Sequence, residues 1–283
     1  MPSTFRAVEH PDARSFLDRA ESFLMGAEDE HNLLLGFALE ATRLPVPPEA
    51  DAPLLVTVES DAGRVVGCAF RTPPHKLGVT RMPLAAVPSL VGATERRCEH
   101  IPAVLGPSDV ATEVAREWVS RHGGIFRAGM RQRIYRLDRV DAPEGVPGRL
   151  RPAEMRDLPL VRVWGEGFTR DAGAGFRPPG GAHERWIAQR SLYLWEDEGA
   201  PVSMAVARGA TPHGIRIGYV YTPPERRGAG YASILVAAVS QRMLDDGFRF
   251  CVLYTDLSNP TSNAIYQRIG YRPVCDVIDV EIA

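Results

Sequence analysis

The segment from Tyr219 to Ser233 constrains the fold of this chain more than any other segment. An apolar run leads through two prolines into a glycine-rich turn, and a helix over 230–246 is predicted to follow. Gly228 and Gly230 let the backbone approach a ligand without a Cβ in the way. The first N–H groups of the helix have no partner within it, and its dipole favours negative charge there. The pattern therefore predicts a site for a phosphate or a pyrophosphate.

Two stretches of sequence resemble one family. The spacing Arg227-Gly-Ala-Gly-Tyr-Ala232 resembles the Arg/Gln-x-x-Gly-x-Gly/Ala signature of the GNAT superfamily of acyl-CoA N-acyltransferases. The stretch from Asp256 to Tyr271 looks like the last helix of that family, in which an Asn near the start and a Tyr seven residues later face the cofactor. The sequence around the glycines most resembles the FR47-like branch of this superfamily. Both stretches lie near the C-terminus, so the resemblance is silent on the acceptor.

The resemblance implies that acetyl-CoA (coenzyme A) is the cofactor. The strand that ends at 220–222 would splay from its neighbour and pair with the pantetheine arm, and a backbone N–H near Val220 would face the thioester oxygen. The alternative is an ordinary buried strand that enters a turn. The cofactor-binding residues implied in this way are Val220, Tyr221, Thr222, Arg227, Gly228, Ala229, Gly230, Tyr231, Ala232, Ser233 and Asn259.

Tyr266 is the candidate catalytic residue, because a phenol with a pKa near 10 can give its proton to the departing thiolate. Asn259, Asn263 and Tyr266 share one helical face by their spacing, and this face would line the cofactor channel. Simpler roles remain open for two of them. Asn259 stands where an N-cap is expected, before Pro260 in the favoured first helical position. A tyrosine on a helix also serves in packing.

The sequence assigns no general base. The strand 217–221 contains no carboxylate, although many family members carry a Glu there, and a base acting through ordered water is an equal alternative. Four carboxylates are candidates by residue type alone: Glu166, Glu196, Glu225 and Asp256. His183 and His213 are expected to be solvated, and Arg226 to face either the phosphates or solvent. Five aromatic residues either wall the acceptor pocket or pack in the core: Trp164, Phe168, Phe176, Trp186 and Trp195.

Length and composition describe an ordinary globular protein. A chain of 283 residues suffices for two domains of about 100–150 residues. A net charge of −2 and a pI of about 6.4 predict neither a nucleic acid nor an anionic membrane as partner. The four cysteines, Cys68, Cys98, Cys251 and Cys275, have no paired spacing, which argues against disulfides and a zinc site. Without a long apolar stretch or leader, the expected location is cytoplasmic.

A Pro/Gly-rich segment at 140–148 divides the chain into two halves with the same predicted order of elements. The first half is expected to hold a helix over 12–42 interrupted near Gly26, strands 54–58, 65–70 and 77–81, helices 84–91 and 108–122, and strand 126–137. The second is expected to hold strand 149–151, helices 153–168 and 183–189, strands 192–195, 202–207 and 215–221, helix 230–246, strand 248–255, helix 260–269 and a closing strand 273–282.

The predicted fold class is α/β (α+β), with two tandem GNAT-like modules, each a mixed and mostly antiparallel twisted sheet flanked by helices. Residues 1–140 would be a degenerate module, since 82–91 offers no glycine turn, and would shape the acceptor site or support a homodimer. Residues 148–283 would be the catalytic domain.

The predicted function is direct transfer of an acetyl group from acetyl-CoA to a primary amine of a small molecule or a peptide. The alternatives are a longer acyl-CoA or an aminoacyl donor, a catalytically silent CoA-binding or scaffold protein, and a binder of another nucleotide. The last is disfavoured because the lysine and hydroxyl of a P-loop are missing after Gly230.

Overall fold

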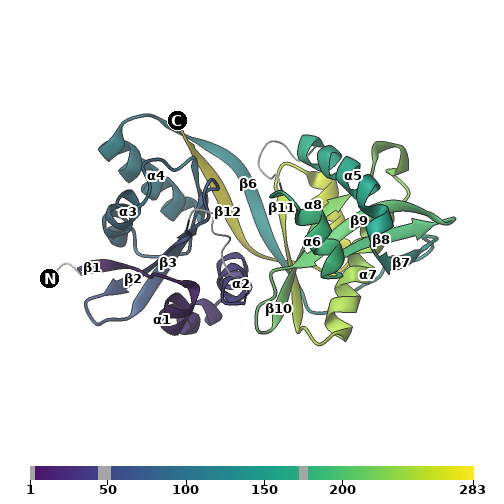
Figure 1. Ribbon diagram of the computed structural model, residues 1–283, viewed down its shortest axis with the longest axis horizontal. Helices are drawn as coiled ribbons and strands as arrows, with labels where there is room; N and C mark the ends of the chain where they lie inside the picture. Colours follow the sequence, from purple (N-terminus) through teal and green to yellow (C-terminus); the bar gives the residue numbers. More distant parts are fainter. Residues whose placement is uncertain (1–3, 44–51, 172–177) are drawn as a thin grey trace. The chain divides into compact units, whose positions relative to one another are not determined.

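The computed structural model describes residues 4–43, 52–171 and 178–283 (Figure 1). Its contacts divide the chain into two compact units. The N-terminal unit comprises Met1–Ile134, Thr255–Ser258 and Val274–Ala283, and the C-terminal unit comprises Tyr135–Tyr254 and Asn259–Pro273. Each unit therefore contains segments from separate parts of the chain.

The same succession of elements occurs twice along the chain: a strand, two helices, three strands, a helix, a strand, a helix and a strand. The first series is β1 (Phe5–Glu9), α1 (Ala13–Met25), α2 (Asn32–Ala41), β2 (Leu54–Ser60), β3 (Val65–Arg71), β4 (Leu77–Val79), the 3-10 turn η1 (Leu84–Ala86), α3 (Val87–Glu95), β5 (Ala103–Gly106), α4 (Ser108–His122) and β6 (Phe126–Leu137).

The second series is β7 (Arg149–Pro152), η2 (Met155–Asp157), α5 (Leu158–Asp171), α6 (Ala182–Ala188), β8 (Leu192–Asp197), β9 (Ala200–Arg208), β10 (Gly214–Tyr221), η3 (Pro224–Arg226), α7 (Tyr231–Asp245), β11 (Phe250–Asp256), α8 (Pro260–Arg268) and β12 (Arg272–Ile282). The repeated order predicted from the sequence is thus confirmed. The sequence-based expectation lacks β1 and β5, both short strands whose few apolar residues give no clear period.

In the N-terminal unit the strand order is β1-β2-β3-β4-β5-β12, and the first part of β6 follows. Neighbours from β1 to β4 pair antiparallel, and β4 pairs with β5 in parallel. β12 pairs antiparallel with β5, from Ile278 opposite Gly106 to Glu281 opposite Ala103. The expectation that the closing strand completes the second half is therefore wrong. Most of this strand is part of the N-terminal unit, where Ile278, Val280 and Ile282 join the core.

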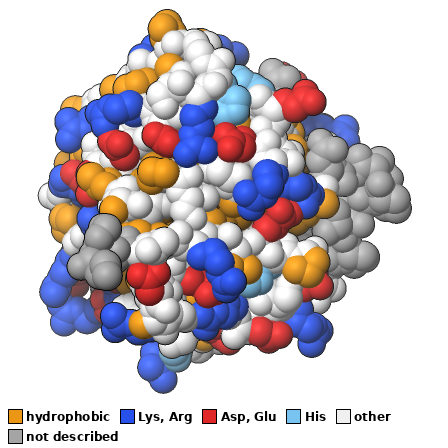
Figure 2. All heavy atoms as spheres, turned by 90° about the vertical axis from the view of Figure 1, so that its left-hand side faces the viewer, with side chains coloured by type: hydrophobic (Ala, Val, Ile, Leu, Met, Phe, Trp, Pro, Cys, Tyr) orange, Lys and Arg blue, Asp and Glu red, His pale blue; other side chains and the backbone are white. Residues whose placement is uncertain are grey.

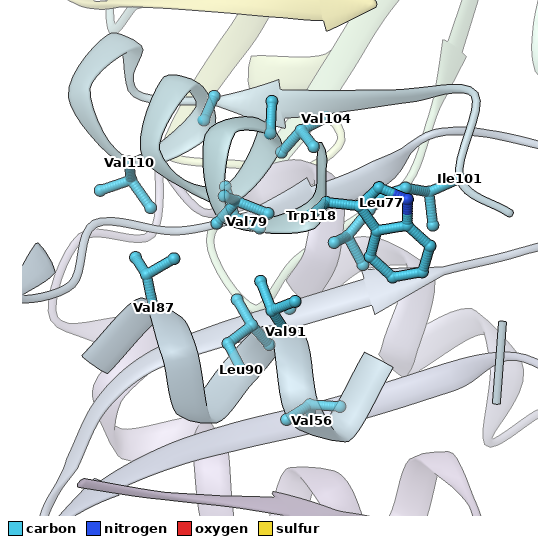
Figure 3. Close-up of a cluster of buried hydrophobic side chains, with 14 of the residues drawn as sticks. Val56, Leu77, Val79, Val87, Leu90, Val91, Ile101, Val104, Val110 and Trp118 are labelled. Atoms are coloured by element: carbon cyan, nitrogen blue, oxygen red, sulfur yellow. The ribbon is translucent and has the colours of Figure 1, made fainter. Parts of the chain in front are cut away.

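Helices cover both faces of the N-terminal unit's sheet. α3 and α4 bury one face, and Figure 3 shows Leu90 and Val91 of α3 close to Val56 of β2, with Trp118 of α4 near Leu77 of β4. On the opposite face, α1 and α2 pack against the other side chains of β2 and β3. On the face drawn in Figure 2, acidic and basic side chains lie interspersed.

The C-terminal unit has the strand order β7-β8-β9-β10-β11, and the end of β6 lies next to β11. Neighbouring strands pair antiparallel except β10 and β11, which are parallel. One apolar cluster joins the sheet to α7, and a separate cluster joins it to α5 and α6. The unit therefore has a helical layer on each face of its sheet, as the sequence predicts.

The four cysteines are free thiols, of which Cys68, Cys98 and Cys251 are buried and Cys275 is half-buried. Burial raises the pKa of both Cys251 and Cys275 to about 12. These two thiols therefore stay protonated near neutral pH and are poor nucleophiles. Among the described residues, no helix is long and apolar enough to cross a membrane.

The placement of β12 can be tested with Ile278→Ala, which we expect to lower the free energy of unfolding by about 2–5 kcal/mol, because a buried Ile side chain is truncated. Hydrogen exchange should accelerate in β2 to β5 and stay unchanged in β8 to β10. Ile125→Ala is the matched control, since Ile125 lies in the same unit but is 69% exposed. Faster exchange confined to the C-terminal unit would contradict the placement.

Candidate functional site

β10 separates from β11 part-way along its length. The parallel pairing joins Gly214–Arg216 to Phe250–Val252, whereas β10 continues to Tyr221. On its other edge β10 stays paired with β9 as far as Tyr221 opposite Met204. The end of β10 therefore presents one edge without a strand partner among the described residues. An extended chain can add to such an edge through backbone hydrogen bonds.

A β-bulge distorts β10 at the same place. The register with β9 shifts between Gly218 and Tyr221, and Tyr219 has a φ of +54°, which is rare for a residue other than glycine. Ile217 belongs to the apolar cluster on the α7 face, whereas Tyr219 and Tyr221 belong to the cluster on the α5 and α6 face. The bulge thus turns both tyrosines toward α5 and α6.

The glycine turn follows β10 after the short η3 and leads into α7. Gly228 and Gly230 have φ values of +85° and +83°, which other residues rarely adopt. A Cβ added to Gly228 would meet no atom within 4 Å, so the space above the turn is open. Gly230 is the N-cap of α7, and no side chain among the described residues caps this helix. The turn fits a pyrophosphate, which would accept hydrogen bonds from the free N–H groups of residues 231–233.

Side chains hold the two ends of this turn. Arg227 donates from Nε to the Thr222 carbonyl at 2.9 Å, and its guanidinium group forms an ion pair with Asp171. Ser203 Oγ donates to the Tyr221 carbonyl at 3.0 Å. The Tyr231 hydroxyl donates to Asp197 Oδ2 at 2.5 Å. Two of the predicted cofactor residues, Arg227 and Tyr231, therefore use their side chains to fix the loop.

The side chain of Asn259 caps α8. Its Oδ1 accepts a hydrogen bond from the Ser262 N–H at 3.0 Å, as the capping alternative predicts. Asn263 Nδ2 donates to the Asn259 carbonyl at 2.7 Å. Asn263 Oδ1 accepts from the hydroxyl of Tyr135 at 3.1 Å, and Gln267 donates to the same hydroxyl at 2.9 Å. The polar face expected to line the cofactor channel is therefore largely bonded within the protein.

Tyr266 lies half-buried on α8, with its ring edge-on to Tyr271 at a centroid distance of 6.0 Å. Burial raises the pKa of its phenol to about 12, so the hydroxyl stays protonated at neutral pH. No hydrogen bond to this hydroxyl occurs within the described part of the chain. Tyr266 therefore has a proton to donate to a ligand.

None of the four candidate carboxylates has the surroundings expected of a general base. Arg149 and Arg151 both bind Glu196, each at 2.6 Å, and these hydrogen bonds lower the pKa of its carboxyl group. Asp256 accepts hydrogen bonds from the backbone N–H and the hydroxyl of Ser258. Glu166 and Glu225 are exposed on α5 and η3. Their surroundings are those of ordinary ion pairs, turns and solvated side chains.

The sequence reasoning missed a pair of residues at the bulge. His183, which was expected to be solvated, is half-buried, and its Nε2 lies 2.9 Å from the Tyr219 hydroxyl. A Cβ at Gly165 would lie 2.4 Å from this hydroxyl, and a Cβ at Gly167 would lie 2.3 Å from that of Tyr221. Glycine lowers the stability of a helix, so two glycines within the predicted helix could have indicated that other side chains pack closely against it.

The aromatic residues of this region have separate roles. Trp164, Phe168 and Trp186 pack with the two tyrosines of the bulge on the α5 and α6 face. Trp195 belongs to the other cluster and donates to the Pro147 carbonyl at 2.8 Å. Phe176 lies outside the described residues. His213 lies between β9 and β10, where its carbonyl accepts a hydrogen bond from the Arg249 N–H at 2.7 Å.

A comparison with models of protein families identifies the family of this domain. The model of the acetyltransferase (GNAT) family matches residues 162–271, from within α5 to the residue before β12. Residues 162–271 are a GNAT domain. No sequence among the curated proteins matches the chain.

Solved structures are similar to the chain beyond the GNAT domain. A Drosophila protein is 13% identical with a TM-score of 0.68, covering 99% of both chains. A GCN5-related N-acetyltransferase from Sphaerobacter thermophilus is 19% identical with a TM-score of 0.60, covering 99% of this chain and 95% of its own. A tandem GNAT protein from the clavulanic acid biosynthesis pathway is 14% identical with a TM-score of 0.57, covering 99% and 98%. The predicted fold of two GNAT-like modules in tandem is confirmed.

The N-terminal unit differs from the GNAT domain at the corresponding elements. β4 and β5 pair through Leu77 and Gly78, and a Cβ at Gly106 would lie 2.6 Å from the Val79 carbonyl oxygen. β4 and β5 therefore lie close together as far as Val79 and Gly106. In α3 the second residue is Pro88, which has no N–H to offer an anion.

Asn259 variants separate a capping role from a cofactor contact in the GNAT domain. We expect Asn259→Ala to lower the free energy of unfolding by about 1 kcal/mol, because the cap is lost, and Asn259→Ser to restore most of it. Thermal unfolding measures both effects. If Asn259→Ser were stable yet bound acetyl-CoA about tenfold more weakly, the amide would contact the cofactor as well.

Proposed function

We propose that the GNAT domain transfers an acetyl group from acetyl-CoA directly to a primary amine of a small molecule or a peptide. The proposal rests on the end of β10, which has no strand partner on one edge among the described residues, and on the open glycine turn that follows it after η3. Such an edge suits the pantetheine arm of acetyl-CoA, and the turn suits its pyrophosphate. The two features are consecutive in the chain, as the two parts of that molecule are.

Acetyl-CoA supplies the acetyl group as a thioester, whose carbonyl carbon a neutral amine can attack. Val220, Tyr221 and Thr222 would orient the arm through their backbone groups, and the backbone N–H near Val220 would stabilise the developing oxyanion. The bonds from Ser203 and Arg227 hold this end of β10 in place. These groups are fixed before binding, which lowers the cost of orienting the thioester.

In the glycine turn, the N–H groups of residues 228–233 would bind the pyrophosphate. Arg227 would hold the turn through its bonds to Thr222 and Asp171 and add positive charge beside it. Because Gly228 has open space above it, phosphate oxygens can approach the backbone closely. Binding then depends on backbone geometry rather than on a single charged side chain.

When the thiolate leaves, Tyr266 would donate its phenol proton to the departing sulfur. Burial keeps this phenol neutral, so it is a hydrogen-bond donor at any physiological pH.

Gly228→Glu tests the cofactor site, because it places a carboxylate in the space that a phosphate would occupy. We expect calorimetric titration to show acetyl-CoA binding by the unmodified protein and none by this variant. Gly63→Glu is the matched control, since Gly63 also has a positive φ and open space around its Cβ position. Loss of binding in both variants, or in neither, would refute the assignment of the turn.

Tyr266→Phe tests the proton donor. We expect kcat for acetyl transfer to fall at least about tenfold, with the Kd of acetyl-CoA unchanged, because only the hydroxyl is removed. Tyr193→Phe, on half-buried Tyr193 of β8, should leave kcat unchanged. Equal rates for Tyr266→Phe and the unmodified protein would remove Tyr266 from the mechanism. A chain that binds acetyl-CoA but acetylates no amine in a broad panel would instead be a silent binding protein.

A further inference from the structure

Acetyl transfer to an amine needs a group that takes a proton from the amine, since an ammonium ion has no electron pair to attack with. None of the carboxylates suggested by the sequence has the surroundings of such a base. The bulge of β10, however, turns a tyrosine hydroxyl toward α6, where it meets an imidazole ring. The tyrosine of this pair, Tyr219, directly precedes Val220, near which the proposed oxyanion donor lies.

The pair is fixed by close packing. His183 Nε2 lies 2.9 Å from the Tyr219 hydroxyl oxygen. The Tyr219 ring packs against Phe168 at 4.6 Å and edge-on to Trp186 at 5.1 Å between centroids. Gly165 leaves room for both groups, because its Cβ would lie 2.4 Å from the hydroxyl and 2.8 Å from Nε2. A side chain at this position of α5 would separate the pair.

The surroundings set the protonation states of the two side chains before an amine binds. Burial lowers the pKa of the His183 imidazole, so the ring is neutral and can accept a proton at neutral pH. Burial also raises the pKa of Tyr219 to about 12, so its hydroxyl stays protonated at neutral pH and can donate to Nε2 when the imidazole proton is on Nδ1. The charged groups near His183 are Glu184, which raises its pKa, and Arg162, which lowers it. These two form an ion pair with each other, so their effects on the ring partly cancel.

We propose that Tyr219 and His183 form the proton acceptor for the substrate amine, an inference that rests on the proposed acetyl transfer. The Tyr219 oxygen accepts a proton from the ammonium group while its own O–H proton passes to His183 Nε2. One N–H bond and one O–H bond break, and a new O–H bond and an Nε2–H bond form. The amine keeps the electron pair that attacks the thioester, and the positive charge moves to the imidazolium.

The test is the pH dependence of kcat/KM for acetylation, measured with the amine that the unmodified chain acetylates best. Activity should be lost as the pH falls through an apparent pKa below 6.5, because a protonated imidazole cannot accept a proton. His183→Gln keeps a hydrogen-bond acceptor for Tyr219 but cannot take up a proton, and Tyr219→Phe removes only the hydroxyl. We expect each change to lower kcat by about 100-fold and to abolish this acidic limb, with the Kd of acetyl-CoA unchanged.

His213→Gln is the matched control, because it makes the same substitution elsewhere in the C-terminal unit, and it should retain the full rate and the acidic limb. If His183→Gln and Tyr219→Phe both kept the rate and the limb of the unmodified protein, the inference would be overturned. If one of these two variants lost thermal stability, the rate and the acidic limb of the other variant alone would test the proton acceptor. Absence of acetyl-CoA binding by the unmodified chain would refute the proposed function itself, which is a separate outcome.

Discussion

The divergence of β10 from β11 is the constraint on which the proposed activity depends. Parallel pairing ends at Arg216 and Val252, while β9 pairs with the other edge of β10 as far as Tyr221, with a shift in register at the bulge. The glycine turn follows this end of β10 after the short η3. A strand that stayed paired on both edges would leave no backbone groups for an extended ligand, whatever the sequence of the turn.

The two units share one succession of elements but differ at the start of the helix that follows β4 and β10. In the N-terminal unit, Gly106 and Val79 lie close together at the ends of β5 and β4, and Pro88 removes a donor from the start of α3. Large buried side chains still build a core around Leu77 and Trp118. The unit therefore keeps a packed core, whereas the segment before its α3 lacks the glycine turn that precedes α7.

The features that sequence reasoning predicted are local ones. Gly228 and Gly230 stand in a turn whose geometry depends on glycine itself, and the cap of α8 depends on Asn259 and the residues just after it. The repeated order of elements follows from short-range periodicity. Such features need no knowledge of which distant segments meet.

The features that the sequence did not predict depend on contacts between residues far apart in the chain. β12 pairs with β5 although most of the chain lies between the two strands, and the residues of β12 themselves do not indicate this pairing. His183 was expected to be solvated because it lies at the end of a predicted helix, yet Tyr219 reaches it through the bulge. Gly165 signals that contact only once the packing of α5 is known.

Hydrogen exchange with and without acetyl-CoA would locate the cofactor on the backbone of the GNAT domain. We expect slower exchange of the amides from 217 to 233 when acetyl-CoA is added, and unchanged exchange from 77 to 95 in the N-terminal unit. Protection of 77–95, or no protection at 217–233, would contradict the proposed cofactor site.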